Sequence, residues 1–180
     1  MPCELKGQGF RGLLDMFKQQ HGDAKFEQLA ASLGGPLGEL VRGRALLAAG
    51  WYPMPWYAQL HEAIAQLAPG SARTLGKAAA REDVNTVFRF VLSLASPARL
   101  ASLGTRIFST FLRGATVTLD SRADRLIHIT FDGCEGANRG VWDDIEGSIE
   151  AFVELSGATG CRVRCVESQG ARAVFEITWG

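Results

Sequence analysis

Two short patterns in this sequence contain residue types that could do chemistry. Residues 7–12 read Gly-Gln-Gly-Phe-Arg-Gly and match the GxGxxG spacing of dinucleotide-binding turns. That turn must follow a strand, so that a helix N-terminus faces the pyrophosphate, and only six residues precede this segment. His61 and Glu62 begin like the HExxH motif of zinc proteases, but Ala65 stands where the second histidine is required. We therefore exclude both sites and expect His61 on the surface of a helix.

The four cysteines do not form a recognisable site. Cys3, Cys134, Cys161 and Cys165 include no CxxC pair, and four cysteines are too few for a disulfide framework in a chain of 180 residues. We expect reduced thiols that pack as small hydrophobic side chains. The sequence also contains no GxSxG nucleophile elbow and no P-loop. We therefore predict that the protein is not an enzyme and has no cofactor and no metal site.

Composition indicates a folded globular protein. Hydrophobic residues make up 47% of the chain and charged residues 21%, values typical of globular domains rather than of disordered segments. A chain of 180 residues can form one domain with a proper core, so we expect a single domain over residues 1–180. No run of lysine and arginine indicates nucleic-acid binding, and no apolar stretch approaches the roughly 18 residues of a membrane span. The first residues also lack the apolar region of a signal peptide, so we predict a cytoplasmic protein.

The charges are unevenly distributed, although the formal net charge is zero. Residues 1–113 contain 13 lysines and arginines against 8 aspartates and glutamates, whereas residues 114–180 contain 6 against 11. Two interpretations remain open. Either the two regions have solvated surfaces of opposite charge, or the acidic face of a helix near the C-terminus contacts a basic face, within the molecule or on a partner.

Apolar residues recur at three- and four-residue steps over most of residues 1–113, which predicts a helical region. Its expected helices are a first one ending near His21-Gly22, a second one beginning at Asp23, and further ones over about 37–47, 55–67, 71–80, 84–94 and 97–111. Gly50-Trp51-Tyr52-Pro53 is expected to form a turn.

Residues 114–180 have a different pattern. Strands are predicted over residues 116–119, 126–131, 161–166 and 173–179, and an amphipathic helix over residues 141–156. Trp142, Ile149 and Phe152 are expected on the inner face of this helix, with its acidic residues on the other faces. The order predicts an α+β fold, in which an N-terminal helical region packs on a four-stranded antiparallel sheet with a crossover helix.

This order of elements resembles a known superfamily. The resemblance rests on the final strand Phe175-Glu176-Ile177-Thr178-Trp179, on Gly50-Trp51-Tyr52-Pro53 before a helix, and on Thr86-Val87-Phe88-Arg89-Phe90 in the helix before Ser96-Pro97. The superfamily contains the heme nitric-oxide/oxygen-binding domains, the four-vinyl-reductase-type sensor domains and the TRAPP transport-complex subunits. Within it, the chain is most similar to a family of uncharacterised proteins abundant in myxobacteria.

The resemblance implies two ligand sites, and the sequence lacks residues that each of them needs. Heme nitric-oxide sensors use a proximal histidine on the helix before the first strand, and residues 100–111 contain none. They also hold the heme propionates with a Tyr-x-Ser-x-Arg motif, which is missing from residues 131–135. Four-vinyl-reductase-type sensors hold zinc near positions that match Cys134 and Cys165, but the other two ligand positions carry residues that do not bind zinc. We therefore expect neither heme nor zinc.

The same relatives enclose an apolar cavity between the helices and the sheet, which holds a porphyrin, an aromatic effector or an acyl chain. Such a cavity needs mostly apolar walls and a few polar groups. The two Trp-Tyr pairs beside prolines have amphipathic side chains that suit a cavity entrance. From the resemblance we expect the ligand-binding residues to be Trp51, Tyr52, Trp56, Tyr57, Phe88, Phe108 and Phe111.

The sequence therefore favours a non-catalytic sensor or adaptor. The leading hypothesis is a module that binds a hydrophobic small molecule, or a protein partner, in place of heme. The first alternative is a dimeric structural scaffold with a filled core, as in the TRAPP-type relatives, and the second is a heme or gas sensor. We expect neither a nucleic-acid partner nor a membrane span.

Overall fold

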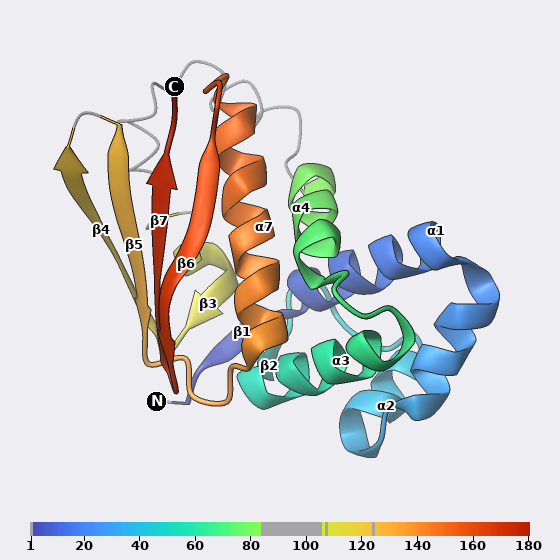
Figure 1. Ribbon diagram of the computed structural model, residues 1–180. Helices are drawn as coiled ribbons and strands as arrows, with labels where there is room; N and C mark the ends of the chain where they lie inside the picture. Colours follow the sequence, from blue (N-terminus) through green and yellow to red (C-terminus); the bar gives the residue numbers. More distant parts are fainter. Residues whose placement is uncertain (1, 84–105, 107, 124) are drawn as a thin grey trace.

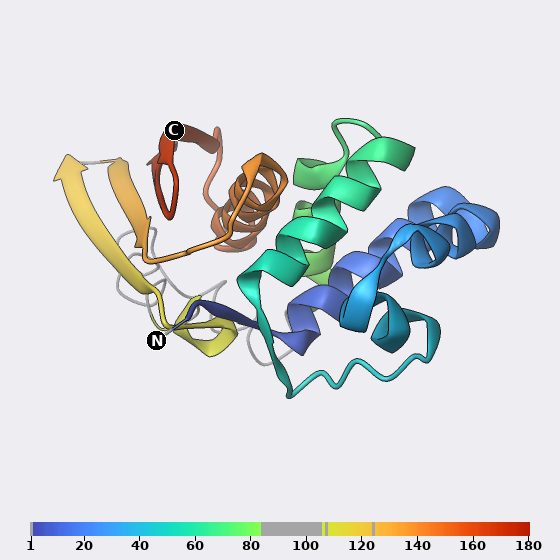
Figure 2. The same ribbon diagram turned by 90° about the horizontal axis from the view of Figure 1, so that it is seen from below.

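The molecule has three layers, seen in the computed structural model of Figure 1, which describes residues 2–83, 106, 108–123 and 125–180. A four-stranded sheet lies on one side, helix α7 (Arg139–Leu155) packs along it, and the N-terminal helices lie beyond α7. The view from below in Figure 2 shows the same order of layers. The α+β fold, with an antiparallel four-stranded sheet and a crossover helix, is therefore confirmed.

Helix α1 (Gly7–Ser32) contains both of the helices predicted on either side of residue 22. Gly22 has φ 84° and ψ 169°, a conformation that residues with a side chain avoid, so the chain kinks there without leaving the helical region. Helix α2 (Gly35–Arg42) ends at Gly43, earlier than the helix predicted over 37–47. The core between these helices contains Phe10, Leu13, Phe17, Leu29 and Leu37.

Helix α3 (Met54–Leu67) agrees with the helix predicted over 55–67 except for the position of its histidine. His61, expected on the helix surface, is only 2% exposed, so that expectation was wrong. The buried stripe runs through Tyr57, Leu60, His61 and Ile64, which places the imidazole toward the core. The ring of His61 lies edge-on to the ring of Tyr57, with 4.7 Å between the centroids.

Helix α4 (Ala72–Asp83) ends the first described part of the chain. The helix predicted over 84–94 lies outside the described residues, as does most of the one predicted over 97–111. Of the latter, residues 108–111 are described and are helical. No helix in the described residues is long and apolar enough to cross a membrane.

The main sheet has the strand order β4-β5-β7-β6, and every neighbouring pair is antiparallel. Its strands are β4 (Thr116–Ala123), β5 (Leu126–Asp132), β6 (Arg162–Gln169) and β7 (Arg172–Thr178). Alternation puts Ile129 opposite Phe175 on the buried face of the central pair. The rings of Phe131 and Phe175 each lie 6.4 Å, centroid to centroid, from Trp142 of α7. Both predicted hairpins are therefore present, and α7 covers their apolar face.

A second, three-stranded sheet was not predicted. Its order is β2-β1-β3, formed antiparallel by β1 (Glu4–Lys6), β2 (Trp51–Pro53) and β3 (Leu112–Arg113). Strands of two or three residues are too short to show an alternating pattern in a sequence. The segment expected as a turn at residues 50–53 is mostly the edge strand β2. The sheet places Leu5 beside Leu112, and both of these side chains reach the cavity described below.

Helices α4 and α7 approach each other closely because both present a glycine at their crossing. A Cβ atom on Gly147 would lie 2.0 Å from the carbonyl oxygen of Arg73, and one on Gly76 would lie 2.4 Å from the carbonyl oxygen of Asp144. Real Cβ atoms essentially never approach other heavy atoms closer than 3.0 Å, so this helix spacing requires glycine at both positions.

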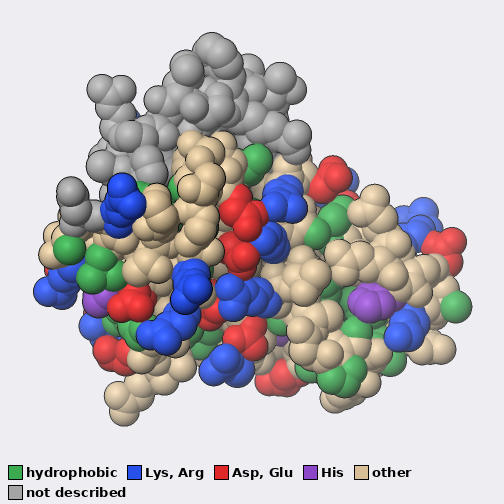
Figure 3. All heavy atoms as spheres, turned by 45° about the horizontal axis from the view of Figure 1, so that its top comes forward, with side chains coloured by type: hydrophobic (Ala, Val, Ile, Leu, Met, Phe, Trp, Pro, Cys, Tyr) green, Lys and Arg blue, Asp and Glu red, His purple; other side chains and the backbone are tan. Residues whose placement is uncertain are grey.

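Ion pairs run along the same pair of helices. Basic side chains one turn apart on α4 contact acidic side chains one turn apart on α7; the residues are Arg73, Lys77 and Arg81 on one helix and Glu146, Glu150 and Glu154 on the other. Lys77 Nζ lies 2.7 Å from Glu150 and 2.8 Å from Glu154. Figure 3 shows acidic and basic side chains intermingled over the middle of the molecular face that it presents. Of the two interpretations of the charge distribution, a contact within the molecule is therefore the one observed.

Candidate functional site

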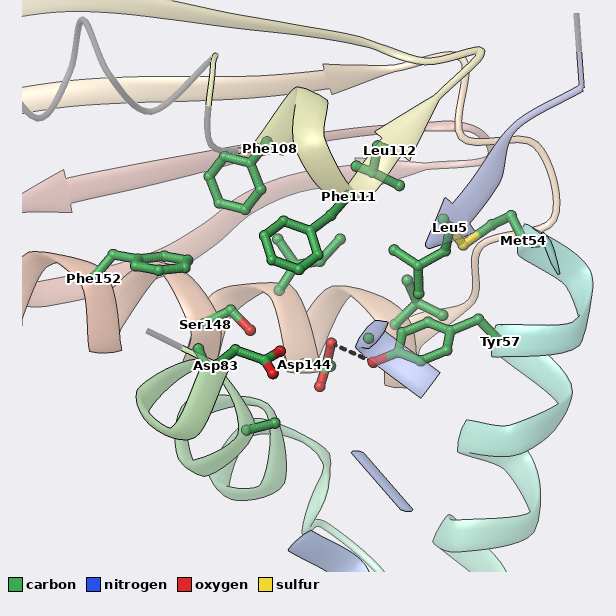
Figure 4. Close-up of a pocket in the computed structure, with 15 residues that line it drawn as sticks. Leu5, Met54, Tyr57, Asp83, Phe108, Phe111, Leu112, Asp144, Ser148 and Phe152 are labelled. Carbon is green, nitrogen blue, oxygen red and sulfur yellow. Dashed lines mark hydrogen bonds between the residues drawn. The ribbon is translucent and has the colours of Figure 1, made fainter. Parts of the chain in front are cut away.

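A cavity of about 80 Å³ lies where β1 and helices α1, α3, α4 and α7 meet the chain at residues 108–112. Most of its lining is apolar, with Leu5 from β1, Met54 from α3 and Ala80 from α4 among the contributors (Figure 4). The polar side chains of the lining are Tyr57, Asp83, Asp144 and Ser148. Apolar walls with a few polar groups are the composition expected of a small-molecule site.

Helix α7 contributes one continuous stripe to the cavity. Its lining residues are Val141, Asp144, Ile145, Ser148 and Phe152, which recur at three- and four-residue steps and so share a face of the helix. The helix begins at Asn138, whose side chain accepts a hydrogen bond from the backbone N–H of Val141 at 3.1 Å. This cap defines the start of the helix that carries the stripe.

Three phenylalanine rings form the wall toward the main sheet. Phe108 and Phe111 come from the helical turn before β3, and Phe152 comes from α7 (Figure 4). The ring of Phe108 is edge-on to Phe131 of the sheet at 5.0 Å and to Phe152 at 6.2 Å, measured between centroids. These contacts join the wall to the core of the main sheet through Phe131.

A buried carboxyl group and a phenol form the polar centre of the cavity. The hydroxyl of Tyr57 donates a hydrogen bond of 3.1 Å to Oδ2 of Asp144, drawn in Figure 4, and both residues are buried. Burial raises the pKa of Asp144 from 3.8 to about 7, although the hydrogen bond from Tyr57 acts in the opposite direction. Burial and the nearby Asp144 charge together raise the pKa of Tyr57 well above 10. Near neutral pH Asp144 therefore exchanges between its neutral and charged forms, while Tyr57 stays protonated.

A second carboxyl group, that of Asp83, lies at the end of α4 on the same cavity. Its Oδ1 accepts a hydrogen bond of 3.2 Å from Nε2 of Gln8. Burial raises the pKa of Asp83, and the hydrogen bond from Gln8 partly offsets this effect.

The structure places the residues predicted to bind a ligand in two groups. Tyr57, Phe108 and Phe111 line the cavity. Trp51, Tyr52 and Trp56 do not, and Phe88 lies outside the described residues.

The three aromatic residues away from the cavity have contacts of their own. Trp51 stacks against the guanidinium of Arg113, whose Cζ is 4.8 Å from the ring centroid. The rings of Tyr52 and Trp56 stack at 6.0 Å, and the Tyr52 hydroxyl accepts a hydrogen bond from the backbone of Leu47. These contacts support β2 and the loop before it.

Sequence reasoning predicted Tyr57 but missed the carboxyl groups of the site. Asp144 was assigned to the solvated face of its helix together with the other acidic residues. A signal was nevertheless present, because Asp144 stands three residues after Val141 and next to Ile145, inside the apolar stripe. No such signal exists for Leu5 or Met54, which reach the cavity only through the small sheet and the start of α3.

All three histidines of the chain are described, and none lines the cavity. His61 packs against Tyr57, and neither of its nitrogens has a hydrogen-bond partner in the part of the chain that the structure describes. Burial lowers its pKa to about 3, so the ring is neutral. His128 lies on β5 with its Nε2 3.6 Å from Glu176, and His21 packs on Phe17 within α1. Within the described residues, no three histidine, cysteine, aspartate or glutamate side chains are grouped to hold a metal ion.

One protein family matches most of this sequence. Residues 26–180 match the family described as "Protein of unknown function (DUF2378)". The chain belongs to the DUF2378 family. No curated protein matches the sequence.

Solved H-NOX proteins, the heme nitric-oxide/oxygen-binding group, are similar to this DUF2378 protein over their whole length. An Fe(II) unliganded H-NOX protein from K. algicida aligns with a TM-score of 0.69 and 13% identity, covering 98% of this chain and 97% of that one. An H-NOX from Shewanella woodyi aligns with a TM-score of 0.66 and 14% identity, covering 97% and 94%. At this identity the likeness shows the fold alone, and the expected resemblance to this group is confirmed at that level. The myxobacterial and TRAPP parts of the resemblance stay predictions.

Proposed function

We propose that this protein is a non-catalytic sensor or adaptor module that binds a small apolar molecule in the cavity lined by Tyr57, Phe108 and Phe111. The observation that carries the proposal is the cavity itself. One water molecule occupies about 10–15 Å³ by this measure, whereas this space is about 80 Å³. Apolar walls disfavour filling it with water and favour an apolar occupant.

The similar structures support a ligand-binding role for this fold. The H-NOX from Shewanella woodyi was solved with IWP-051 bound, and another similar structure is an oxygen-binding H-NOX domain in its oxygen complex. Work on heme distortion in the H-NOX family places heme in those relatives. The question for this chain is therefore which occupant its own lining fits.

The lining does not fit a histidine-ligated heme. The axial ligands of heme iron in proteins are histidine, cysteine, methionine and tyrosine side chains. No histidine or cysteine lines the cavity, and residues 84–105 contain none of the four types. Of the remaining two types, Met54 and Tyr57 are present, but the hydroxyl of Tyr57 is engaged with Asp144. A space of about 80 Å³ also suits a slender molecule better than a macrocycle.

The test uses the purified protein without added cofactor. We expect its absorption spectrum to lack the Soret band of heme, and we expect hexan-1-ol to bind with one-site saturation in calorimetry. We also expect hexan-1-ol to raise the melting temperature, since a ligand selective for the folded state stabilises it by mass action. A Soret band at stoichiometric heme would overturn the proposal in favour of a heme sensor.

Matched variants test whether hexan-1-ol binds in this cavity. Ala80→Leu places extra carbon atoms into the cavity and should abolish hexan-1-ol binding, whereas Ala31→Leu makes the same change on the exposed face of α1 and should preserve it. Ser148→Leu repeats the test from α7. Unchanged binding in both cavity variants, or no binding by the unmodified protein, would favour a scaffold with a filled core.

A further inference from the structure

Among the described residues, the lining of the cavity combines apolar walls with negative charge alone. Its lining contains two carboxyl groups, Asp83 and Asp144, and no lysine, arginine or histidine among the described residues. A ligand with a negatively charged end would place that charge beside two acidic groups in a partly buried site. The lining therefore selects against carboxylate and phosphate ligands.

Asp144 is only 6% exposed, and no cationic side chain of the described residues pairs with it. In the described part of the chain its side chain has one hydrogen-bond donor, the hydroxyl of Tyr57, and no ion pair. The other buried acidic residue of α7, Glu146, differs, because it is paired with Arg73. Burying an ionised carboxylate without a cation is costly, so an incoming cation gains more at Asp144 than at a solvated acid.

The aromatic wall complements this charge. Figure 4 shows the rings of Phe108 and Phe111 across the cavity from the side chains of Asp144 and Asp83. Phenyl faces attract ammonium groups through their quadrupole and also pack against methylene groups. One molecule with an ammonium end and an apolar body would satisfy both sides of the cavity.

We propose that the cavity binds a primary alkylamine as its ammonium ion, with Asp144 as the counter-ion, Asp83 as a second acceptor and the alkyl chain against the phenylalanine wall. This inference rests on the proposed function and names the ligand class for the same site. The volume of about 80 Å³ favours a short unbranched chain. An ammonium ion is positively charged, whereas acyl chains and porphyrins bear negatively charged carboxylates.

The test compares three molecules of equal length by calorimetry at pH 8: hexylamine, hexan-1-ol and hexanoate. At this pH an alkylamine is protonated and Asp144 is mostly ionised. We expect hexylamine to bind about tenfold or more tightly than hexan-1-ol, as a charge-assisted hydrogen bond in a partly buried site should give. Hexanoate should show no saturable binding.

The variants test the residue assignment. In Asp144→Asn, which keeps an acceptor for Tyr57, the preference for the amine over the alcohol should disappear. Asp143→Asn removes a neighbouring acid that pairs with Arg139 and does not line the cavity, so it should keep the preference. Asp83→Asn provides a second variant and should reduce the preference in part.

The possible outcomes separate this inference from the proposed function. If hexan-1-ol binds as tightly as hexylamine, if hexanoate binds as well as the amine, or if Asp144→Asn keeps the preference, the amine inference is wrong while the ligand-binding proposal stands. If neither the amine nor the alcohol binds, both are wrong.

Discussion

Replacing Gly147 by alanine tests the close crossing of α4 and α7, on which the whole cavity depends. The new Cβ would lie 2.0 Å from the carbonyl oxygen of Arg73, whereas ordinary contact begins at 3.4 Å. The clash is with backbone, so it cannot be relieved by rotating a side chain. The helices would have to move apart by about 1.4 Å, which would also stretch the ion pairs between them.

The magnitude follows from two opposing effects. Overpacking costs about 1–3 kcal/mol, and a clash this short with backbone belongs to the upper part of that range, about 2–3 kcal/mol, while the better helix propensity of alanine returns about 1 kcal/mol. We therefore expect Gly147→Ala to lower the free energy of unfolding by about 1–2 kcal/mol. Gly12→Ala in α1 is the matched control, because its Cβ would meet its nearest neighbour, Asp83, at an ordinary 3.4 Å. This control should gain about 0.5–1 kcal/mol.

The assay is urea denaturation followed by circular dichroism at 222 nm, with thermal melts in parallel. For a chain of this size the two variants should differ by about 3–12 °C in melting temperature, with Gly12→Ala the higher. If Gly147→Ala is as stable as the unmodified protein or more stable, the helices do not approach as described and the reasoning about this crossing is wrong.

Three further predictions concern the core, the ion pairs and the buried titratable groups. Phe131→Ala should cost about 3–5 kcal/mol in urea denaturation, because Phe131 is fully buried; a loss under about 1 kcal/mol would contradict its place in the core. Glu150→Ala should lower the free energy of unfolding by about 1–2 kcal/mol, and by less at high salt. Glu167→Ala, which removes an exposed ion pair, should change it by no more than about 0.5 kcal/mol. Equal losses for the two variants would refute the difference between the two pairs. The raised pKa of Asp144 means that the folded state binds a proton more tightly than the unfolded state, so its contribution to stability falls as pH rises from about 4 to about 7. The lowered pKa of His61 means that the folded state binds a proton less tightly than the unfolded state, so the contribution of His61 to stability falls as pH decreases from about 6.5 to about 3. Asp144→Asn should therefore lose stability more steeply than the unmodified protein on acidification. His61→Phe should lose stability more steeply than the unmodified protein as pH rises from 4 to 7. If the urea midpoints of both variants run parallel to those of the unmodified protein between pH 4.5 and 7.5, these assignments are wrong.

Local patterns were enough to predict the main sheet and α7. Strands β5 and β7 alternate with period two because one face is buried, and α7 repeats with the helical period because one face packs on that sheet. These periods are written in consecutive residues, so they can be recognised without knowing what each element contacts. The same is true of the kink in α1, where Gly22 was recognised as a helix break.

Contacts between distant residues could not be predicted in this way. The acidic face of α7 was expected in solvent or against an unspecified basic face, and only the packing of α4 against it showed where Glu150 and Glu154 bind. His61 and Asp144 were assigned to polar surfaces because their side chains are polar, although each stands in an apolar stripe of its helix.

The sequence by itself therefore determined the fold class and the elements near the C-terminus, because these depend on periodicity and on residue type. The resemblance to a known superfamily added part of the aromatic wall. The tertiary structure alone decided which polar groups face the cavity. Asp144 meets Tyr57 across 87 positions of the chain, and Gln8 meets Asp83 across 75. Such pairs depend on how whole helices approach one another, here α3 with α7 and α1 with α4, and no periodicity in the sequence records those distances.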